Sequence, residues 1–494
     1  MINGFDSEKY IKLQSENIKK RIDLFGNKLY LEFGGKLFDD HHASRVLPGF
    51  QPDNKLKMLL QLKDKAELII VINANDIEKN KIRGDYGITY DLDVLRLIDA
   101  FRSVDLYVGS VVLTRFAEQP NSIKFIRRLN DLGIKVYKHF TINGYPNDIE
   151  TILSEEGFGK NEFIETTRPL VILTAPGPGS GKMATCLSQL YHENKRGVKA
   201  GYAKFETFPI WNLPLKHPVN VAYEAATADL GDVNMIDNYH LDAYGTMAVN
   251  YNRDLESFPV LDATFKAIWG YSPYKSPTDM GVNMAGYCIT DDEICSEASK
   301  QEVIRRYLDA LCGQIQGVTT RAVVQKQETL MKSLNLTTAD RPVIAAANAK
   351  AEETGHPAAA MQLSDGRIIT GKTSSLLGAS SALLLNALKV LGNIPDDIEL
   401  IPPSVIVPVQ HLKLDHLKNR NPRLHLDELL IALTISATTS RYAERAMEQI
   451  KKLNGFEVHS TVILSQVDSK VFKKLGMNLT CNAVYQTKKL YHAN

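Results

Sequence analysis

The chain has 494 residues, of which 44% are hydrophobic and 23% charged, with 58 basic and 57 acidic residues. A net charge of +1 creates no overall field that attracts nucleic acid or an anionic membrane, so neither is expected as a partner. No apolar run approaches the roughly 20 residues that span a bilayer, the N-terminal segment lacks a signal-peptide pattern, and the five cysteines form no C-x-x-C pair. We therefore expect a cytoplasmic protein with reduced thiols.

Helix-type and strand-type patterns alternate along residues 1–165. Apolar residues recur with helical spacing in residues 7–25 and 90–103, whereas residues 28–33 and 66–74 form apolar strand-like runs. Strands that are separated by helices of this length imply parallel crossovers. The sequence therefore predicts an α/β fold with mostly parallel sheets and flanking helices.

The expected strand at residues 28–33 is followed by Gly34, Gly35 and Lys36 and then by a polar segment that reaches Arg45. One interpretation is a polar surface loop. The other is a substrate-binding loop, in which Lys36 and Arg45 orient the carboxylate or phosphate group of a second substrate.

Residues 168–197 read as an apolar strand, a glycine-rich loop and a helix that begins near Lys182. Glycine allows the backbone to approach an anion closely, and a helix start points free amides toward it. We expect Lys182 to neutralise phosphate charge. The residues expected to surround the phosphate are Gly177, Gly179, Ser180, Gly181, Lys182 and Thr185.

This loop departs from the nucleotide-binding pattern G-x-x-x-x-G-K-[ST]. Pro176 stands at the first glycine position, and Met183 stands where the pattern has a hydroxyl residue. An alternative is therefore a tight turn between strand and helix with an exposed lysine.

Acidic and basic residues follow the loop. Lys204 and Glu206 end the next expected strand, and Asp237 follows the apolar run VNMI. Because carboxylates at strand ends commonly hold Mg²⁺ beside a nucleotide, Thr185 and Asp237 are predicted as magnesium ligands, with ATP or another nucleotide as the cofactor. The alternative for Asp237 is a turn or helix cap. Residues 213–283 have weak periodicity, which is typical of long functional loops.

A second segment, Gly366 to Thr373, fits the nucleotide-binding pattern literally. Its central residues Ile368 and Ile369 are β-branched and favour a strand, so we expect a hairpin and not a phosphate loop. Lys372 and Thr373 precede an apolar helix, where the hydroxyl groups either cap that helix or contact an anion.

Composition shifts divide the chain into four expected regions. These are an N-terminal α/β region (1–165), a phosphate-loop α/β region (166–290), a helical subdomain (291–335) and a C-terminal α/β subdomain (336–494).

Four segments carry a resemblance to a known family. They are YGITYDLDVLRLIDAFR, LTAPGPGSGKMATCLSQLYHE, KFETFPIWNLPLKHPVNVAYEAATADLGD and DGRIITGKTSSLLGASSALLLNALK. Across essentially its whole length the chain resembles the bacterial family named domain of unknown function 1846. The resemblance implies an N-terminal α/β region with a helical insertion and a separate C-terminal α/β subdomain, and it implies no particular activity.

We expect an enzyme that binds a nucleotide or another phosphorylated small molecule and catalyses phosphoryl transfer or ATP-driven ligation. Its candidate catalytic residues are Lys182, Asp237, Lys36 and Arg45. Two alternatives stay open: an ATP-independent isomerase or transferase of the phosphosugar type, and a non-catalytic ligand sensor or assembly protein. Whether the chain forms a homo-oligomer is also open.

Overall fold

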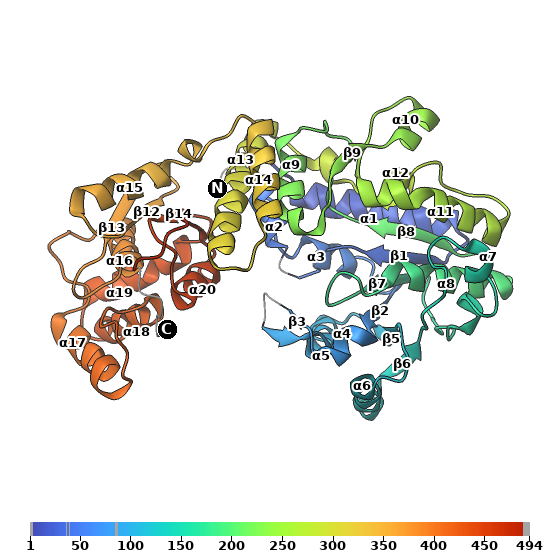
Figure 1. Ribbon diagram of the computed structural model, residues 1–494, viewed down its shortest axis with the longest axis horizontal. Coiled ribbons are helices and arrows are strands. Elements are labelled where there is room, and N and C mark those ends of the chain that lie inside the picture. The colour runs from blue at the N-terminus through green and yellow to red at the C-terminus, as the bar shows by residue number, and fades with distance from the viewer. Residues whose placement is uncertain (1–2, 36, 39, 84–86, 488–494) are drawn as a thin grey trace. The chain divides into compact units, whose positions relative to one another are not determined.

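The computed structural model describes residues 3–35, 37–38, 40–83 and 87–487. The chain divides into two compact units. The first consists of Ile2–Glu224 and Gly231–Ser296, and the second contains Ala225–Leu230 and Glu297–Asn494. Each unit has its own sheet and its own apolar core (Figure 1).

The first unit contains a sheet of seven parallel strands. In spatial order the strands are β11 (Gly281–Val282), β8 (Gly201–Phe205), β1 (Leu29–Phe33), β7 (Leu170–Thr174), β2 (Ala66–Asn73), β5 (Val108–Thr114) and β6 (Lys135–Lys138). Every residue of β1, β2, β7 and β8 is buried. These central strands are apolar runs because helices cover both faces of a parallel sheet.

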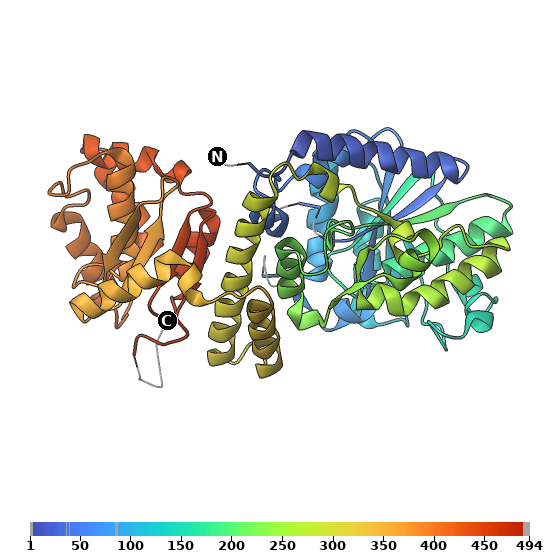
Figure 2. The same cartoon turned by 90° about the horizontal axis from the view of Figure 1, so that it is seen from above.

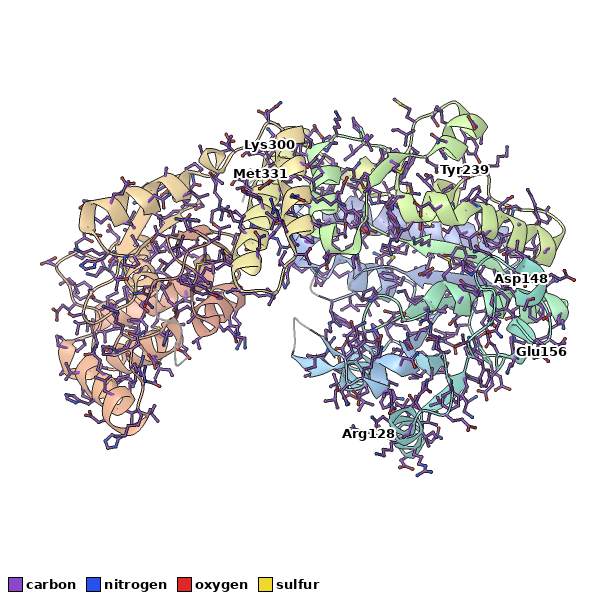
Figure 3. The ribbon with its side chains drawn as sticks, viewed as in Figure 1. Arg128, Asp148, Glu156, Tyr239, Lys300 and Met331 are labelled. Carbon is purple, nitrogen blue, oxygen red and sulfur yellow. The ribbon has the colours of Figure 1, made fainter. Side chains whose placement is uncertain are left out.

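Helices cover the sheet on both faces (Figure 2). On one face α1 packs against α3, and on the other α8 packs against α11. The helices of this unit are α1 (Ser7–Leu24), α2 (His41–Val46), α3 (Asn54–Leu60), α4 (Ala74–Glu78), α5 (Tyr90–Arg102), α6 (Pro120–Asp131), α7 (Ile149–Ile152), α8 (Lys182–Lys195), α9 (Pro218–Ala226), α10 (Asn238–Tyr244), α11 (Asn252–Trp269) and α12 (Pro277–Met280). Charged side chains such as Arg128, Asp148 and Glu156 lie at the surface (Figure 3).

Two small antiparallel pairs complete the first unit. They are β3 (Ile82–Arg83) with β4 (Ile88–Thr89), and β9 (Asn234–Ile236) with β10 (Val249–Tyr251). The expected boundary at residue 165 falls inside the large sheet, because β7 pairs with both β1 and β2.

The second unit is built around a mixed sheet of four strands. In spatial order these are β13 (Ile368–Lys372), β12 (Ala358–Gln362), β14 (Glu457–Ser460) and β15 (Asn478–Cys481). β12 is antiparallel to both of its neighbours, and β14 is parallel to β15. The α/β class predicted from the sequence is therefore confirmed in both units.

Helices precede, separate and flank these strands. They are α13 (Asp292–Ile315), α14 (Arg321–Ser333), α15 (Pro342–Thr354), α16 (Ala379–Gly392), α17 (Pro403–His411), α18 (Leu426–Ala437), α19 (Arg441–Glu448) and α20 (Gln466–Lys474). The pair α13 and α14 lies in the segment expected to be helical. Among the described residues, no helix combines the length and apolar character needed to cross a bilayer. All five cysteines are free thiols.

Candidate functional site

The direction of chain travel reverses near the middle of the large sheet. Connections that leave β1, β2 and β5 lead toward β6, whereas those that leave β7 and β8 lead toward β11. In open parallel sheets, ligands bind outside the carboxyl ends of the strands where this direction reverses. The segments that follow β8, β1, β7 and β2 are therefore the first place to look for a site.

The glycine-rich loop follows β7 at this edge. φ is +73° at Gly179 and +94° at Gly181, and this left-handed backbone conformation favours glycine. A Cβ atom at Gly177 would stand 2.4 Å from the Tyr90 hydroxyl, so a larger residue there would require the Tyr90 side chain to move. All three glycines are thus explained by local geometry, and they bring bare backbone to the strand edge.

Two neighbouring strand ends hold the loop in place. The Asn73 side-chain amide at the end of β2 donates a hydrogen bond to the Gly179 carbonyl at 3.4 Å. The Thr114 hydroxyl at the end of β5 donates to the Ser180 carbonyl at 2.5 Å. Because these bonds occupy carbonyl oxygens, the amide groups of the loop and helix start stay available.

Among the described residues, the start of α8 has hydrogen-bond donors and a cation without partners. An α-helix leaves its first amides without intrahelical acceptors, and Gly181 at the N-cap supplies no side chain. The Ser180 hydroxyl is buried and has no hydrogen-bond partner among the described residues. The Lys182 ammonium, at the first helical position, makes no hydrogen bond or ion pair within the described part of the chain. A cation at this end of a helix is unfavourable unless an anion joins it.

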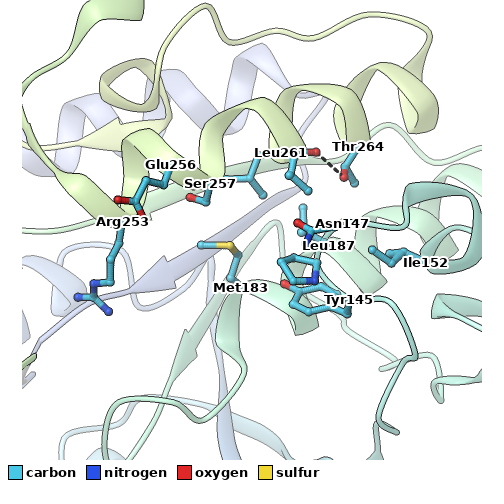
Figure 4. A pocket seen from close by; sticks show the side chains of 12 residues that line it. Tyr145, Asn147, Ile152, Met183, Leu187, Arg253, Glu256, Ser257, Leu261 and Thr264 are labelled. Carbon is cyan, nitrogen blue, oxygen red and sulfur yellow. Dashed lines mark hydrogen bonds between the residues drawn. The ribbon is translucent and has the colours of Figure 1, made fainter. Parts of the chain in front are cut away.

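A pocket of about 280 Å³ adjoins the first turns of α8 (Figure 4). Met183 and Leu187 of α8 form one wall, and Glu256 and Ser257 of α11 form the opposite wall, with Tyr145 at a third side. The pocket combines apolar walls with a few polar groups, which is typical of sites for small molecules.

Arg253 also lines this pocket, next to Asp254 in sequence. Its Nε lies 2.6 Å from Oδ1 of Asp232, and the Asp232 carboxylate raises the pKa of Arg253 against the opposing effect of burial. The guanidinium is thus fixed as a cation at the pocket wall.

A buried group of charged and polar residues lies at the end of β8. The Lys204 ammonium is 2.7 Å from both carboxylate oxygens of Asp254 and 3.0 Å from Oε1 of Glu206. It also donates to the Tyr251 hydroxyl, which in turn donates to Oε1 of Glu206 at 2.5 Å. We call Lys204, Glu206, Tyr251 and Asp254 the β8 cluster.

The β8 cluster assembles from two chain segments. Tyr202, Lys204 and Glu206 alternate along β8 and its end, so they share one face of the sheet. Tyr251 ends β10, and Asp254 lies in the first turn of α11. On β1, Glu32 pairs in register with Lys204 and accepts a hydrogen bond from Tyr202 at 2.8 Å.

Burial perturbs the titration of the β8 cluster. Burial raises the pKa of Glu206 to about 7, with the Asp254 charge adding to this effect and the Lys204 ammonium opposing it. For Lys204, burial lowers the pKa, but the surrounding carboxylates outweigh burial and raise the pKa above its ordinary value. Burial and the same carboxylates raise the pKa of Tyr251. Lys204 therefore stays charged, Tyr251 stays protonated, and Glu206 changes its charge near neutral pH.

The two expected magnesium ligands have other contacts. The Thr185 hydroxyl is buried and donates to the Gly181 carbonyl at 3.0 Å. Asp237 is the buried N-cap of α10 and accepts hydrogen bonds from the His240 amide at 3.0 Å and the Thr278 hydroxyl at 2.6 Å. These are the contacts of the helix-cap interpretation. Within the described residues, no group of three or more His, Cys, Asp or Glu is arranged to hold a metal ion.

The segment after β1 is described only in part. Lys36 lies outside the described residues. Arg45 lies in the last turn of α2, and Asp40 at the N-cap of that helix is 2.7 Å from the Lys55 ammonium. Gly34 packs closely against the end of β8, since a Cβ there would be 3.0 Å from Cγ of Glu206.

The second glycine–lysine segment belongs to the second unit and forms a hairpin, as predicted. Ile368 to Lys372 is strand β13, paired with β12, and Lys372 is exposed. The helix that follows begins only at Ala379, with Gly378 at its N-cap, so neither Lys372 nor Thr373 caps it. The capping interpretation is wrong for these two residues, because Ser374 instead closes a turn before the helix by accepting the Leu377 amide at 3.1 Å.

Sequence reasoning did not find Glu32, Tyr251, Arg253 and Asp254. Residues 213–283 were expected to be mainly loop, yet they contain α9, α10, α11 and α12. Tyr251 and Asp254 are about 50 positions from Lys204 in sequence, and no local sequence pattern indicates that their side chains contact it. The one available signal was Lys204 itself, since a lysine inside an apolar strand requires a buried anionic partner.

Comparisons with known proteins agree over nearly the whole chain. The family model described as domain of unknown function DUF1846, N-terminal, matches residues 3–335, and its C-terminal counterpart matches residues 339–491. A UPF0371 protein of Streptococcus pyogenes serotype M5 (strain Manfredo) is 56% identical over 488 residues, covering 99% of each chain. A UPF0371 protein of Streptococcus thermophilus has the same identity and coverage. The chain belongs to the family of the domain of unknown function DUF1846.

Proposed function

We propose that this protein is an enzyme that binds a small phosphorylated metabolite, with the phosphate group at the start of α8. The observation that carries the proposal is the Lys182 ammonium, which has no partner among the described residues although it lies at the positive end of a 14-residue helix. A bound dianion would relieve this repulsion and accept hydrogen bonds from the first helical amides.

The buried Ser180 hydroxyl supports the same proposal independently. A buried hydroxyl without a partner is costly, and a phosphate oxygen at the helix start would supply the missing acceptor. The pocket between α8 and α11 offers room for the rest of a small molecule, since Met183 in its wall directly follows Lys182.

A nucleotide held with Mg²⁺ is a less well supported form of the proposal. The hydroxyl of Thr185 and the carboxylate of Asp237 already have partners within the protein. A phosphorylated metabolite that binds without a metal requires only the hydrogen-bond donors and the lysine at the start of α8.

The test is thermal unfolding in the presence of inorganic phosphate, sugar phosphates and ATP, each with Mg²⁺ and with a chelator. A ligand at 100 times its Kd stabilises the folded state by about 2.7 kcal/mol. Lys182→Ala should lose this stabilisation, whereas Lys372→Ala, which removes an equal charge from the other glycine–lysine segment, should keep it.

Three outcomes bear on the proposal. Stabilisation by phosphate compounds that disappears only in Lys182→Ala supports it. Stabilisation that persists in Lys182→Ala, or that disappears in Lys372→Ala instead, contradicts it. Stabilisation by ATP alone and only with Mg²⁺ would replace the metabolite with a nucleotide at the same helix start.

A further inference from the structure

The β8 cluster lies beside the proposed phosphate site in the order of the strands. β1 alone separates β7, which leads into the glycine-rich loop, from β8, which leads into Glu206. Neighbouring strands are about 4.8 Å apart, so the two strand ends are roughly 10 Å apart. A phosphorylated compound of three to six carbons spans that distance.

One member of the β8 cluster is more accessible than its partners. The Glu206 side chain is 23% exposed, against 10% for Lys204 and 8% for Asp254. The Lys204 ammonium contacts Asp254, Glu206 and Tyr251, so its three N–H donors are already used within the cluster. Lys204 therefore positions its neighbours and does not bind a substrate directly. Glu206 is thus the group of the cluster that a substrate can reach.

We propose that Glu206 is a catalytic base that removes a proton from the carbon next to the carbonyl group of a phosphorylated aldose or ketose. This inference rests on the proposed function, because the start of α8 would hold the substrate's phosphate. Tyr251, Lys204 and Asp254 are positioning residues. Tyr251 and Lys204 fix the Glu206 carboxylate by two contacts at one oxygen, Oε1, which leaves Oε2 for the substrate.

The proton transfer balances within the substrate and one side chain. The C–H bond breaks, its proton forms an O–H bond with Glu206, and its electron pair moves toward the carbonyl group to give an enolate. Reprotonation of a carbon of the enolate by Glu206 restores the carboxylate. A general base works best when its pKa lies near the working pH, and burial brings the pKa of Glu206 to about 7.

Several titratable groups face Glu206 and set its charge. Lys204 and Asp254 contact it or act on it from β8 and α11, and Tyr251 and Tyr223 act on it from β10 and α9. Loss of the Tyr251 hydroxyl removes a hydrogen bond that favours the charged carboxylate, so Tyr251→Phe should raise the pKa of Glu206 further.

The first experiment measures proton exchange in D₂O with dihydroxyacetone phosphate, ribose 5-phosphate and fructose 6-phosphate as probes. The wild-type protein should exchange the proton next to the carbonyl group of at least one probe. Glu206→Gln should slow this exchange at least 100-fold while keeping the stabilisation by phosphate, because general bases contribute about 10²–10⁴-fold. Glu16→Gln, on the exposed side of α1, should change neither property.

The second experiment titrates the carboxyl groups by NMR of protein labelled with ¹³C in glutamate. The resonance missing from Glu206→Gln should titrate near pH 7, and Tyr251→Phe should move both this midpoint and the pH profile of exchange upward. A merely structural Tyr251 would leave the pH profile unchanged.

The outcomes separate the two proposals. Exchange that is equally fast in Glu206→Gln, or a wild-type protein that binds phosphate but exchanges no probe, overturns the role of Glu206 and leaves the phosphate site standing. A Glu206 resonance that titrates near pH 4.5 also overturns it. Absence of any phosphate effect in the wild-type protein overturns the proposed function, and the inference falls with it.

Discussion

Of the two glycine–lysine segments of this chain, the one that fits the nucleotide-binding pattern better has the structure that is less suited to binding phosphate. Gly366 to Thr373 fits the nucleotide-binding pattern and is half of a β-hairpin, with its lysine exposed on a strand. The segment from Pro176 to Met183 breaks the pattern at two positions and is a loop that opens a helix. Backbone preference decides the difference, because β-branched residues favour a strand whereas glycines with positive φ bend the chain.

The largest expected effect is the loss of stability when glycine is replaced by alanine, which should differ between the two segments. A Cβ at Gly371 would stand 2.2 Å from the Leu383 backbone nitrogen, whereas a Cβ at Gly179 meets nothing within 4 Å. Gly371→Ala should lower the free energy of unfolding by about 3 kcal/mol because α16 must shift away from β13. Gly179→Ala should cost only about 1 kcal/mol of backbone strain.

Chemical denaturation of both variants measures these two costs. Equal costs, or a larger cost at Gly179, would mean that the second segment is not the tightly packed hairpin described above.

The next largest effect concerns the pH dependence of stability that Glu206 causes at the edge of the large sheet. Burial raises the pKa of Glu206 from its ordinary value of 4.5 to about 7, so between these values the folded state binds more protons than the unfolded state. Stability contributed by this group is therefore present below pH 4.5 and is lost as the pH rises to about 7. The free energy of unfolding of Glu206→Gln, relative to that of the wild type, should therefore increase by about 2 kcal/mol as the pH rises from 5 to 8.

Urea denaturation across this pH range tests the gain. Glu16→Gln serves as the control and should show no such trend. A constant difference between Glu206→Gln and the wild type would show that Glu206 has the same pKa in both states.

A smaller effect is expected at Ser180. Its hydroxyl has no partner among the described residues, so Ser180→Ala should leave the stability of the ligand-free protein unchanged or slightly higher. Phosphate binding should weaken by about tenfold, the value of one hydrogen bond to a charged group. Calorimetric titration with inorganic phosphate checks both expectations. Unchanged affinity together with lost stability would assign Ser180 a structural role.

The smallest effect is a difference in ligand-free stability between the alanine variants of the two lysines. Lys182→Ala should stabilise the ligand-free protein by about 0.5 kcal/mol, because a cation leaves the positive end of α8. Lys372→Ala on its strand should change stability by less than that. Destabilisation by Lys182→Ala in the absence of ligand would indicate an internal partner for this lysine.

Much of the fold could be predicted from sequence because its signals are local. The central strands β1, β2, β7 and β8 are mostly apolar and fully buried, and the glycine-rich loop lies between a strand and a helix as expected. The hairpin at β13 followed from Ile368 and Ile369.

The parts that were not predicted depend on contacts between distant segments. α11 was obscured by Pro259 inside the helix and by weak periodicity, so Asp254 at its start was not recognised as the partner of Lys204. Asp237 directly follows the short strand β9, but β9 pairs with β10 and not with the large sheet. A strand end in sequence therefore did not indicate which edge the residue would join.

The most direct measurement of the central claim is a crystal structure of the protein soaked with tungstate, an electron-dense analogue of phosphate. We predict one tungstate at the start of α8, within hydrogen-bond distance of the Ser180 hydroxyl, the first helical amides and the Lys182 ammonium, and none at Lys372. Tungstate bound at Lys372 with the start of α8 empty would contradict the claim.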